Sequence, residues 1–169
     1  MSEPVRRQVG IVSVTCGERV VLVEPCNIYG CIIGDDTFVG PFVEIQKDVA
    51  IGCRCRIQSH SFVCELVTIG DDCFVGHGVM FINDTFAAGG PARGRKELWR
   101  STVIGDGVSI GSNATIMPVK VTSGCVIGAG AVVTKDLSVP GVYLGNPARL
   151  VRTLPATVTK KISPSPPQF

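Results

Sequence analysis

The sequence predicts an all-β fold, a solenoid in which short parallel strands and tight turns stack into a prism. Nine six-residue units run in unbroken register over residues 33–86, and a small or β-branched residue stands at the fifth position of each. The first position is always aliphatic or aromatic: Ile33, Val39, Ile45, Ile51, Ile57, Val63, Ile69, Val75 and Phe81. A six-residue period fits neither the 3.6-residue turn of an α-helix nor the two-residue alternation of an ordinary strand. A fixed hexapeptide period is typical of a β-helix.

Each position of the unit has a physical role. We expect the first residue to point inward and to stack on its equivalent in the next coil. The fifth residue also points into the narrow interior, which limits its volume; these residues are Thr37, Val43, Val49, Cys55, Ser61, Val67, Cys73, Val79 and Thr85. The second position is expected at a corner that needs the backbone freedom of glycine, and glycine fills it at Gly34, Gly40, Gly52, Gly70 and Gly76. Three units make one triangular coil, and each coil pairs with the next.

The repeat is interrupted after Thr85 and then resumes, with first positions at Ile104, Ile110, Ile116, Ile127, Val133 and Val139. Ile116 and Ile127 are eleven residues apart instead of twelve, so a distortion is expected around residues 119–123. Residues 1–32 are less regular, and a partial capping coil is expected there from Leu22, Ile28, Cys31 and Ile32. We therefore predict a single domain over residues 1–154, an inserted loop at about 86–102, and a flexible, proline-rich tail over 155–169.

Composition excludes several classes of protein. The 169 residues suffice for one domain with a sizeable core, and a net charge of +2 favours neither a nucleic acid nor an anionic membrane as partner. The chain has no apolar run of the ~20 residues that span a membrane and no apolar stretch of a signal peptide, so a cytoplasmic location is expected.

The cysteines are interpreted as core residues and no metal site is predicted. There is no C-x-x-C pair, and four of the eight cysteines stand at the small inward position: Cys31, Cys55, Cys73 and Cys125. There they act as small hydrophobes, and a reducing compartment keeps the thiols free.

The interruption is where a binding site is expected. It contains the only tryptophan, Trp99, and four cations, Arg93, Arg95, Lys96 and Arg100. Insertions in solenoids form loops on one face, often the binding face. A basic arm of this kind suits an anionic ligand such as a nucleotide diphosphate. The alternative is a solvated loop whose Trp99 merely docks on the solenoid.

Polar residues stand next to this loop. His77 is flanked by glycines and projects outward near a corner, and His60 is also outside the core. Asn83 and Asp84 lie at the root of the loop, where a rigid coil can orient a ligand. For both histidines the alternative is ordinary polar surface.

Three later motifs resemble those of hexapeptide-repeat acyltransferases: Ile110-Gly-Ser-Asn-Ala-Thr-Ile-Met-Pro118, Ile127-Gly-Ala-Gly-Ala-Val-Val-Thr-Lys-Asp136 and Gly145-Asn-Pro-Ala-Arg149. The resemblance covers roughly residues 28–152. It implies a left-handed parallel β-helix, an exception to the usual right-handed crossover, with acetyl-CoA as co-substrate and a homotrimer with sites between subunits. The segments His60-Ser-Phe-Val-Cys-Glu65 and Gly76-His-Gly-Val-Met-Phe-Ile-Asn-Asp84 most resemble N-acetyltransferases of nucleotide-linked amino sugars, with a 3-amino sugar favoured, in surface polysaccharide synthesis.

The resemblance also implies roles for individual residues. Asn83 and Asp84 would hold the amine, and Asp84 or His77 would take up its proton. Glu65 and His60 would contact the sugar, and Arg93 and Arg95 the diphosphate. Acetyl-CoA would contact the backbone around Ser112, Asn113, Ala129 and Ala131. Its nucleotide end and phosphates would contact Thr134, Lys135, Arg149 and Arg152. Asn146 and Pro147 would shape the wall beside the adenine.

Three other functions are alternatives to this one. An O-acetyltransferase would use His77 as its base, since a hydroxyl needs strong general-base help that an amine does not; the inserted loop contains no histidine. A zinc hydratase on this fold needs three histidine ligands, and the chain has two histidines. A non-catalytic β-helix scaffold would have no use for the CoA-side motifs.

Overall fold

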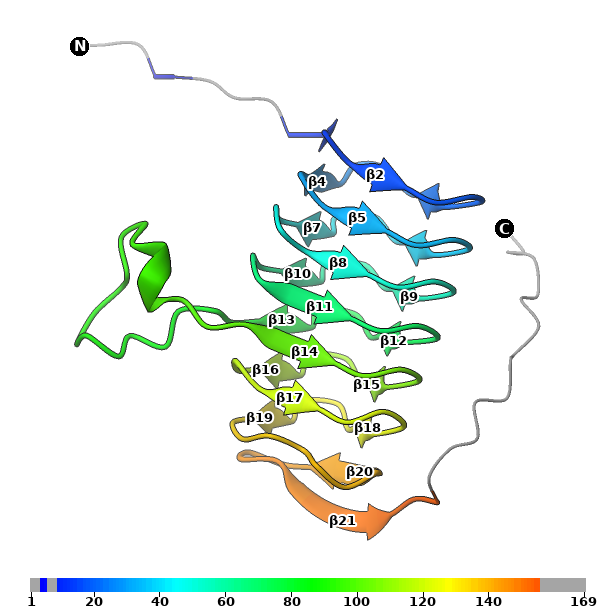
Figure 1. Cartoon of the computed structure of the whole chain (residues 1–169), viewed down its shortest axis with the longest axis vertical. Coiled ribbons are helices and arrows are strands. Elements are labelled where there is room, and N and C mark those ends of the chain that lie inside the picture. The colour runs from blue at the N-terminus through cyan, green and yellow to red at the C-terminus, as the bar shows by residue number, and fades with distance from the viewer. Residues whose placement is uncertain (1–3, 6–8, 156–169) are drawn as a thin grey trace.

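The computed structural model describes residues 4–5 and 9–155 and winds them into stacked coils (Figure 1). The parallel strands form three sheets of seven, six and eight strands, which we call sheets A, B and C. In Figure 1 the front strands β5, β8 and β11 run from left to right while successive coils descend from the N-terminus, so the winding is left-handed. The expected left-handed parallel β-helix is thus confirmed.

The strands are short, and each coil visits sheets A, B and C in turn. Sheet A holds β1 (Ile11–Val12), β4 (Asn27–Tyr29), β7 (Glu44–Ile45), β10 (Phe62–Val63), β13 (Met80–Phe81), β16 (Thr115–Ile116) and β19 (Val132–Val133). Sheet B holds β2 (Thr15–Cys16), β5 (Ile32–Ile33), β8 (Ala50–Ile51), β11 (Val67–Ile69), β14 (Thr102–Ile104) and β17 (Lys120–Val121). Sheet C holds β3 (Val21–Leu22), β6 (Phe38–Val39), β9 (Arg56–Ile57), β12 (Phe74–Val75), β15 (Ser109–Ile110), β18 (Val126–Ile127), β20 (Gly141–Leu144) and β21 (Arg149–Thr153). Strand β21 pairs antiparallel with β20 at the C-terminal end of the prism. We name the corners between the sheets AB, BC and CA.

The core is one continuous column of the predicted residues. Every first-position residue from Ile33 to Phe81 is at most 3% exposed, and the expected core cysteines are buried. The prediction for Thr85 is wrong, because this residue is exposed in the loop. Thr102 takes its place, 1% exposed and paired with Val67 of the preceding coil. The insertion therefore begins directly after Phe81 and ends before Thr102, which belongs to the solenoid.

The corner glycines are required for a different reason from the one expected. Gly34 has an ordinary φ, but a Cβ added to it would lie 2.7 Å from the carbonyl carbon of Gly52 in the next coil. The left-handed conformation falls two residues later in the unit, at Asp36 and at the equivalent His60. Where glycine stands at the second position, as at Gly34, it is needed because the next coil approaches closely there, and not because of its backbone freedom.

The shortened repeat is accommodated one turn earlier than expected. Val121 lies in β17 and is 3% exposed, so the missing residue falls in the turn at residues 117–119. Leu137 then bridges to Val121 and is 6% exposed, whereas Val139 is 43% exposed. The prediction of Val139 as a core residue is wrong, since the unit after Val133 is also short.

At the N-terminal end, Ile28 and Cys31 are buried as expected, but Ile32 is 57% exposed on sheet B. The first coil is formed by β1, β2 and β3. Residues 156–169 of the predicted tail lie outside the described residues.

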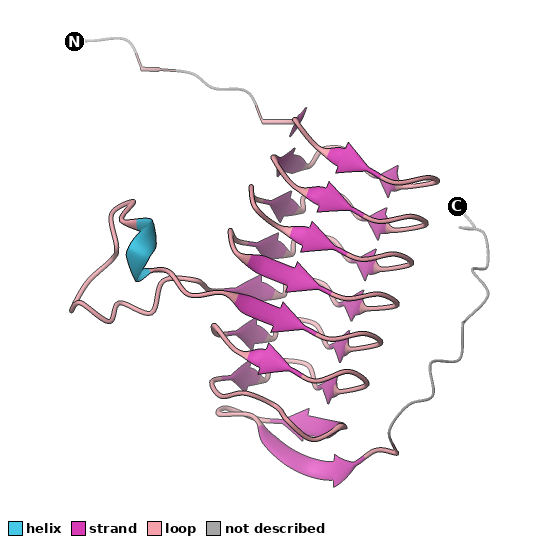
Figure 2. Cartoon of the chain, viewed as in Figure 1, coloured by secondary structure: helices cyan, strands magenta, loops and turns pink. Residues whose placement is uncertain are grey.

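One segment leaves the prism. Residues 82–101, which we call the arm, project from corner AB between β13 and β14 and carry the 3-10 helix η1 (Lys96–Leu98) (Figure 2). Among the described residues, no helix has the length and apolar character that crossing a membrane requires.

Candidate functional site

The root of the arm is held by Asn83. Its side-chain Nδ2 donates to the carbonyl oxygen of Glu65 at 3.2 Å, one coil away at the same corner. Its own carbonyl oxygen accepts the N–H of Arg100 at 2.9 Å, which closes the base of the arm. The bond to Glu65 uses one of the two Nδ2 hydrogens and holds the amide in place, so Oδ1 is the acceptor that Asn83 would offer to a ligand.

Asp84 organises the first turns of the arm. Its carboxylate accepts the backbone N–H of Phe86 at 3.0 Å and that of Ala92 at 2.6 Å. Ala92 is 1% exposed. A carboxylate bonded to two backbone donors holds a loop in one conformation, so Asp84 shapes the segment that carries the cations.

Glu65 and Lys96 join the arm to the prism. The side chain of Glu65 is 11% exposed, and its carboxylate forms an ion pair with the ammonium of Lys96. This contact raises the pKa of Lys96. The same ammonium lies 5.4 Å from the centre of the Trp99 ring, a cation–π distance.

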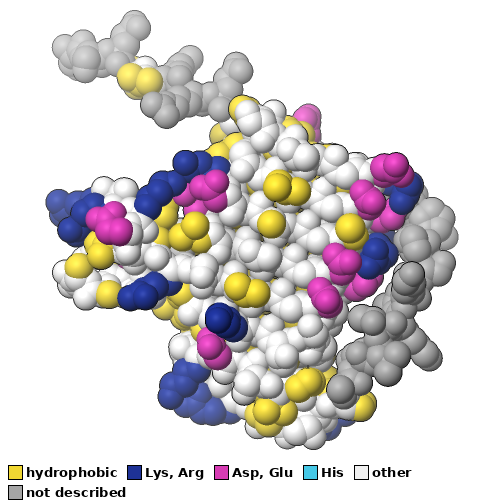
Figure 3. All heavy atoms as spheres, viewed as in Figure 1, with side chains coloured by type: hydrophobic (Ala, Val, Ile, Leu, Met, Phe, Trp, Pro, Cys, Tyr) yellow, Lys and Arg dark blue, Asp and Glu magenta, His cyan; other side chains and the backbone are white. Residues whose placement is uncertain are grey.

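The remaining cations of the arm face solvent. Arg93 and Arg95 are exposed, and Nε of Arg95 donates to the carbonyl of Ala92 at 3.3 Å. Figure 3 shows Lys and Arg side chains gathered on the arm, beside the face of sheet B.

Both histidines lie at corner CA. His77 is exposed between β12 and β13, and its carbonyl accepts the N–H of Asn113 in the next coil at 2.8 Å. His60 is exposed one coil earlier, with its ring 4.9 Å from that of Phe42. The expected outward placement of both histidines is confirmed.

Corner CA also carries part of the predicted CoA site. The carbonyl of Ser112 accepts the N–H of Gly130 at 2.9 Å, so Ser112, Asn113 and Ala129 lie in a ladder below His77. Ala131 differs because it is buried, its N–H donates to Gly128 at 3.2 Å, and its carbonyl accepts from Thr115 at 2.9 Å. Its backbone groups are therefore already bonded within the chain.

The other CoA-side residues lie elsewhere. Thr134 and Lys135 are exposed at corner AB, below the arm, and Arg149 and Arg152 are exposed on β21. Asn146 and Pro147 are exposed in the turn between β20 and β21 and are joined by a cis peptide bond.

Apart from the residues on β21 and in the turn before it, the predicted site residues thus fall at two corners of one chain. Corner AB brings together Asn83, Asp84, Glu65 and the arm, whereas corner CA holds His60, His77 and the Asn113 ladder. Strand β13 runs between the two corners along sheet A. One chain alone does not bring His77 to Asn83.

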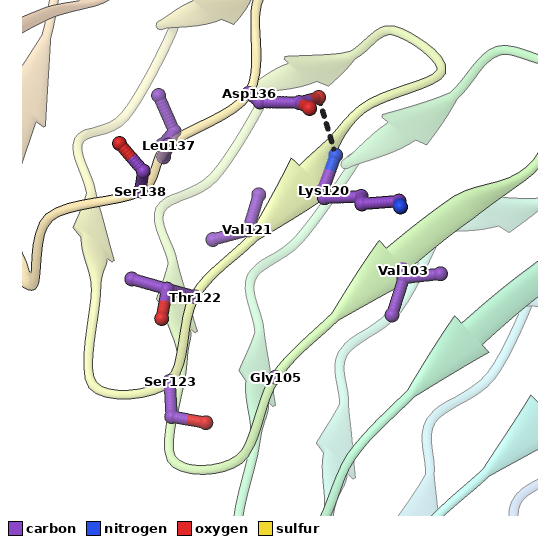
Figure 4. A pocket seen from close by; sticks show the side chains of 9 residues that line it. All are labelled: Val103, Gly105, Lys120, Val121, Thr122, Ser123, Asp136, Leu137 and Ser138. Carbon is purple, nitrogen blue, oxygen red and sulfur yellow. Dashed lines mark hydrogen bonds between the residues drawn. The ribbon is translucent and has the colours of Figure 1, made fainter.

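The structure also has a hollow that the sequence did not predict. About 430 Å³ in volume, it lies on sheet B and the adjoining turns, lined by Val103, Gly105, Lys120, Val121, Thr122, Ser123, Asp136, Leu137 and Ser138 (Figure 4). The backbone N–H of Lys120 donates to Asp136 Oδ1 at 2.8 Å along its edge. The irregular repeat spacing pointed to this part of the chain but not to a hollow. Within the described residues, no group of three or more His, Cys, Asp or Glu side chains could hold a metal ion.

Two family models match the repeats. "Hexapeptide repeat of succinyl-transferase" matches residues 66–80 and 101–135, and "Bacterial transferase hexapeptide (six repeats)" matches residues 30–65. The bifunctional protein GlmU of Rubrobacter xylanophilus is 32% identical over 127 residues, which are 75% of this chain and 25% of that protein. The chain thus spans about a quarter of the length of this relative.

Solved structures share the fold. An N-acyltransferase from Bacillus cereus, AntD, determined with dTDP and 3-hydroxybutyryl-CoA, has a TM-score of 0.69 at 20% identity, covering 83% of this chain and 82% of that one. A mutant of the perosamine N-acetyltransferase from Caulobacter crescentus, determined with CoA and GDP-perosamine, has a TM-score of 0.59 at 22% identity, covering 78% of this chain and 52% of that one. A hexapeptide-repeat acetyltransferase from Vibrio cholerae, determined with acetyl-CoA, has a TM-score of 0.54 at 23% identity, covering 82% and 70%.

Proposed function

Because this chain belongs to the hexapeptide-repeat transferases, we propose that it is an acetyl-CoA-dependent N-acetyltransferase acting on the amine of a nucleotide-linked amino sugar. A 3-amino sugar used in surface polysaccharide synthesis is the favoured substrate. The observation that carries the proposal is the fixed amide of Asn83, whose Nδ2 is bonded to Glu65 at the root of a cationic arm.

Asn83 provides what an amine acceptor needs. With Nδ2 bonded to the chain, Oδ1 accepts a hydrogen bond from the substrate amine and directs the nitrogen lone pair toward the thioester. Positioning of this kind supplies much of the acceleration for a nucleophile that is already reactive when neutral. The acceptor therefore requires no strong base at corner AB.

The reaction is an acyl transfer that involves no change of oxidation state. The amine nitrogen bonds to the acetyl carbonyl carbon, and the resulting oxyanion is stabilised by backbone N–H donors. The carbon–sulfur bond then breaks, CoA leaves as the thiolate, and the surplus proton leaves the nitrogen through Asp84, His77 or water. The products are an amide and CoA.

The arm supplies charge for the nucleotide. Arg93 and Arg95 are exposed and lie on the segment shaped by Asp84. Guanidinium groups bind phosphate oxygens with paired, charge-assisted hydrogen bonds. We assign the diphosphate of the nucleotide sugar to these two residues, with the sugar toward Glu65 of the same chain and His60 of a neighbouring subunit.

The two corners would complete one site in a homotrimer. Corner CA of one subunit, with Ser112, Asn113 and Ala129, would face corner AB of its neighbour, with acetyl-CoA between them. Lys135, Arg149 and Arg152 are exposed cations suited to the polyanionic end of CoA. This arrangement would operate in the cytoplasm.

One observation favours a second candidate, an O-acetyltransferase. The exposed imidazole of His77 lies in the same corner ladder as Asn113, so it could act as a base beside acetyl-CoA. Under this alternative the acceptor is a sugar hydroxyl or that of another small molecule.

The deciding experiment measures release of the CoA thiol from acetyl-CoA with a panel of UDP- and dTDP-linked 3-amino and 4-amino sugars. Matched sugars with a hydroxyl in place of the amine are the control. We expect turnover only with amines, loss of about 100-fold in kcat/KM for Asn83→Ala, and partial retention for Asn83→Ser. Turnover restricted to hydroxyl acceptors, or full activity of Asn83→Ala, would reject the proposal.

A further inference from the structure

We propose that Glu65 and Lys96 form a clamp that docks the arm on the prism, and that both are positioning residues for the amine site. The catalytic consequence of this inference rests on the proposed function, whereas the docking itself does not. Glu65 stays a predicted contact of the sugar, and its contacts within the chain add a role in holding the arm.

Glu65 is the junction of three parts of the chain. Its N–H donates to Oε1 of Gln46 at 3.3 Å, its carbonyl accepts from Asn83, and its carboxylate binds Lys96. A carboxylate that is 11% exposed is costly to desolvate unless a cation pairs with it. The arm supplies that cation, so docking the arm compensates for the burial of Glu65.

The coil before Glu65 braces it. Nε2 of Gln46 donates to Oε1 of Glu44 at 2.9 Å, which turns Oε1 of Gln46 toward the N–H of Glu65. This chain of hydrogen bonds crosses three coils and ends at Asn83. The orientation of the Asn83 amide is therefore set from the same residue that binds the arm.

The arm has few other attachments near its tip. Gly89, Gly90 and Gly94 have no atom within 4 Å of an added Cβ, and η1 has no buried residue. Lys96 lies in η1 and also contacts the Trp99 ring. Asp84 still holds the chain at Ala92. Loss of the ion pair would thus loosen η1 and the segment between Ala92 and η1, which carries Arg93 and Arg95.

The test is limited trypsin digestion of the whole protein without substrate, with cuts after Arg93 and Arg95 followed by mass spectrometry. Glu65→Gln removes the charge and leaves every tryptic site in place. We expect these cuts to accelerate about tenfold, the change typical of losing a charge-assisted hydrogen bond. Asp36→Asn is the matched control, because it removes a carboxylate that pairs with Arg19 at the distant corner BC, and it should leave cleavage of the arm unchanged.

Kinetics then separate positioning from simple stability. Glu65→Gln should raise KM for the nucleotide sugar about tenfold and change KM for acetyl-CoA little. Lys96→Met should raise KM for the nucleotide sugar in the same way, and Lys96→Arg should keep most of the wild-type affinity. The double variant Glu65→Gln/Lys96→Met should cost no more than either single change, since the pair acts as a unit. If Glu65→Gln does not fold, the exposed Lys96→Met carries the test.

The outcomes distinguish the two proposals. Wild-type cleavage rates in both Glu65→Gln and Lys96→Met would overturn the clamp even if the enzyme acetylates amino sugars. Faster cleavage together with no turnover of any amino sugar would support the docking and overturn the proposed function. Faster cleavage with unchanged KM would support docking and reject the positioning role.

Discussion

Replacing Gly34 by alanine should destabilise the prism although the backbone at Gly34 is relaxed. The added Cβ would lie 2.7 Å from the carbonyl carbon of Gly52 and 2.8 Å from the nitrogen of Cys53. Both are backbone atoms of the next coil, so no side-chain rotation relieves the contact. Ordinary contact begins at 3.4 Å, so the two coils must separate locally by about 0.7 Å (3.4 minus 2.7).

The energy follows from that displacement. Gly34 donates its N–H to Ile51 at 2.8 Å, and a shift of this size stretches the bond to the limit of useful geometry. Overpacking costs about 1–3 kcal/mol, and the weakened hydrogen bond about 1 kcal/mol. The loss of unfolded-state entropy returns about 0.4–1 kcal/mol. The net loss of about 2 kcal/mol corresponds to a fall in Tm of about 4–8 °C for a chain of this size.

Thermal and urea unfolding followed by circular dichroism measure the effect, with two glycine controls. Gly90→Ala meets no atom within 4 Å at an ordinary φ, and should change stability by less than about 1 kcal/mol. Gly107→Ala also has open space but has a φ of +63°, so it isolates a left-handed backbone cost of about 1–2 kcal/mol. A Gly34→Ala protein with the same melting temperature and urea midpoint as the wild type would refute the close-approach argument.

Further expectations concern the thiols and His77. Desolvation by burial raises the pKa of Cys31 to about 11 and that of Cys64 to about 12. Ellman's reagent at pH 8 should therefore label the native protein only at the exposed Cys16 and the half-buried Cys53. All eight thiols should react only in denaturant. Because these folded-state pKa values exceed the ordinary thiol pKa of about 8.5, the two buried thiols stabilise the fold fully below that pH, and this stabilisation is lost as the pH rises. The urea midpoint of unfolding should therefore fall between pH 9 and pH 11. A midpoint that stays constant over this range would contradict the burial argument. His77→Asn should keep kcat within about threefold under amine chemistry, since general-base help is worth about 100-fold or more where it is needed; a loss of that size would assign His77 as the base.

The sequence by itself determined the solenoid, because its signal is local and repeated. Each unit of six residues contains its own inward positions, so Ile57 and Val63 could be placed in the core without knowing their neighbours, and both are buried. The place of the arm was also predictable, because an insertion interrupts the period. Its cations and the polar residues at its root could be read directly from the chain.

Only the tertiary structure decided how the coils meet. The steric reason for Gly34 depends on Gly52, eighteen residues away, and the replacement of Thr85 by Thr102 depends on which residue completes the coil after the insertion. Likewise, the period predicted Val139 in the core, whereas the structure buries Leu137 there instead, beside Val121.

The candidate site divides in the same way. The residue types at Asn83 and Asp84 pointed to the root of the arm from the sequence alone, and Glu65 was named through the family resemblance. Glu65 and Lys96 are 31 residues apart, and Lys96 lies in the arm, outside the hexapeptide repeat. The period of the repeat therefore could not predict that they pair. A hexapeptide period determines which residues face inward, but contacts between an inserted arm and the coil beside it depend on distances that only the folded chain defines.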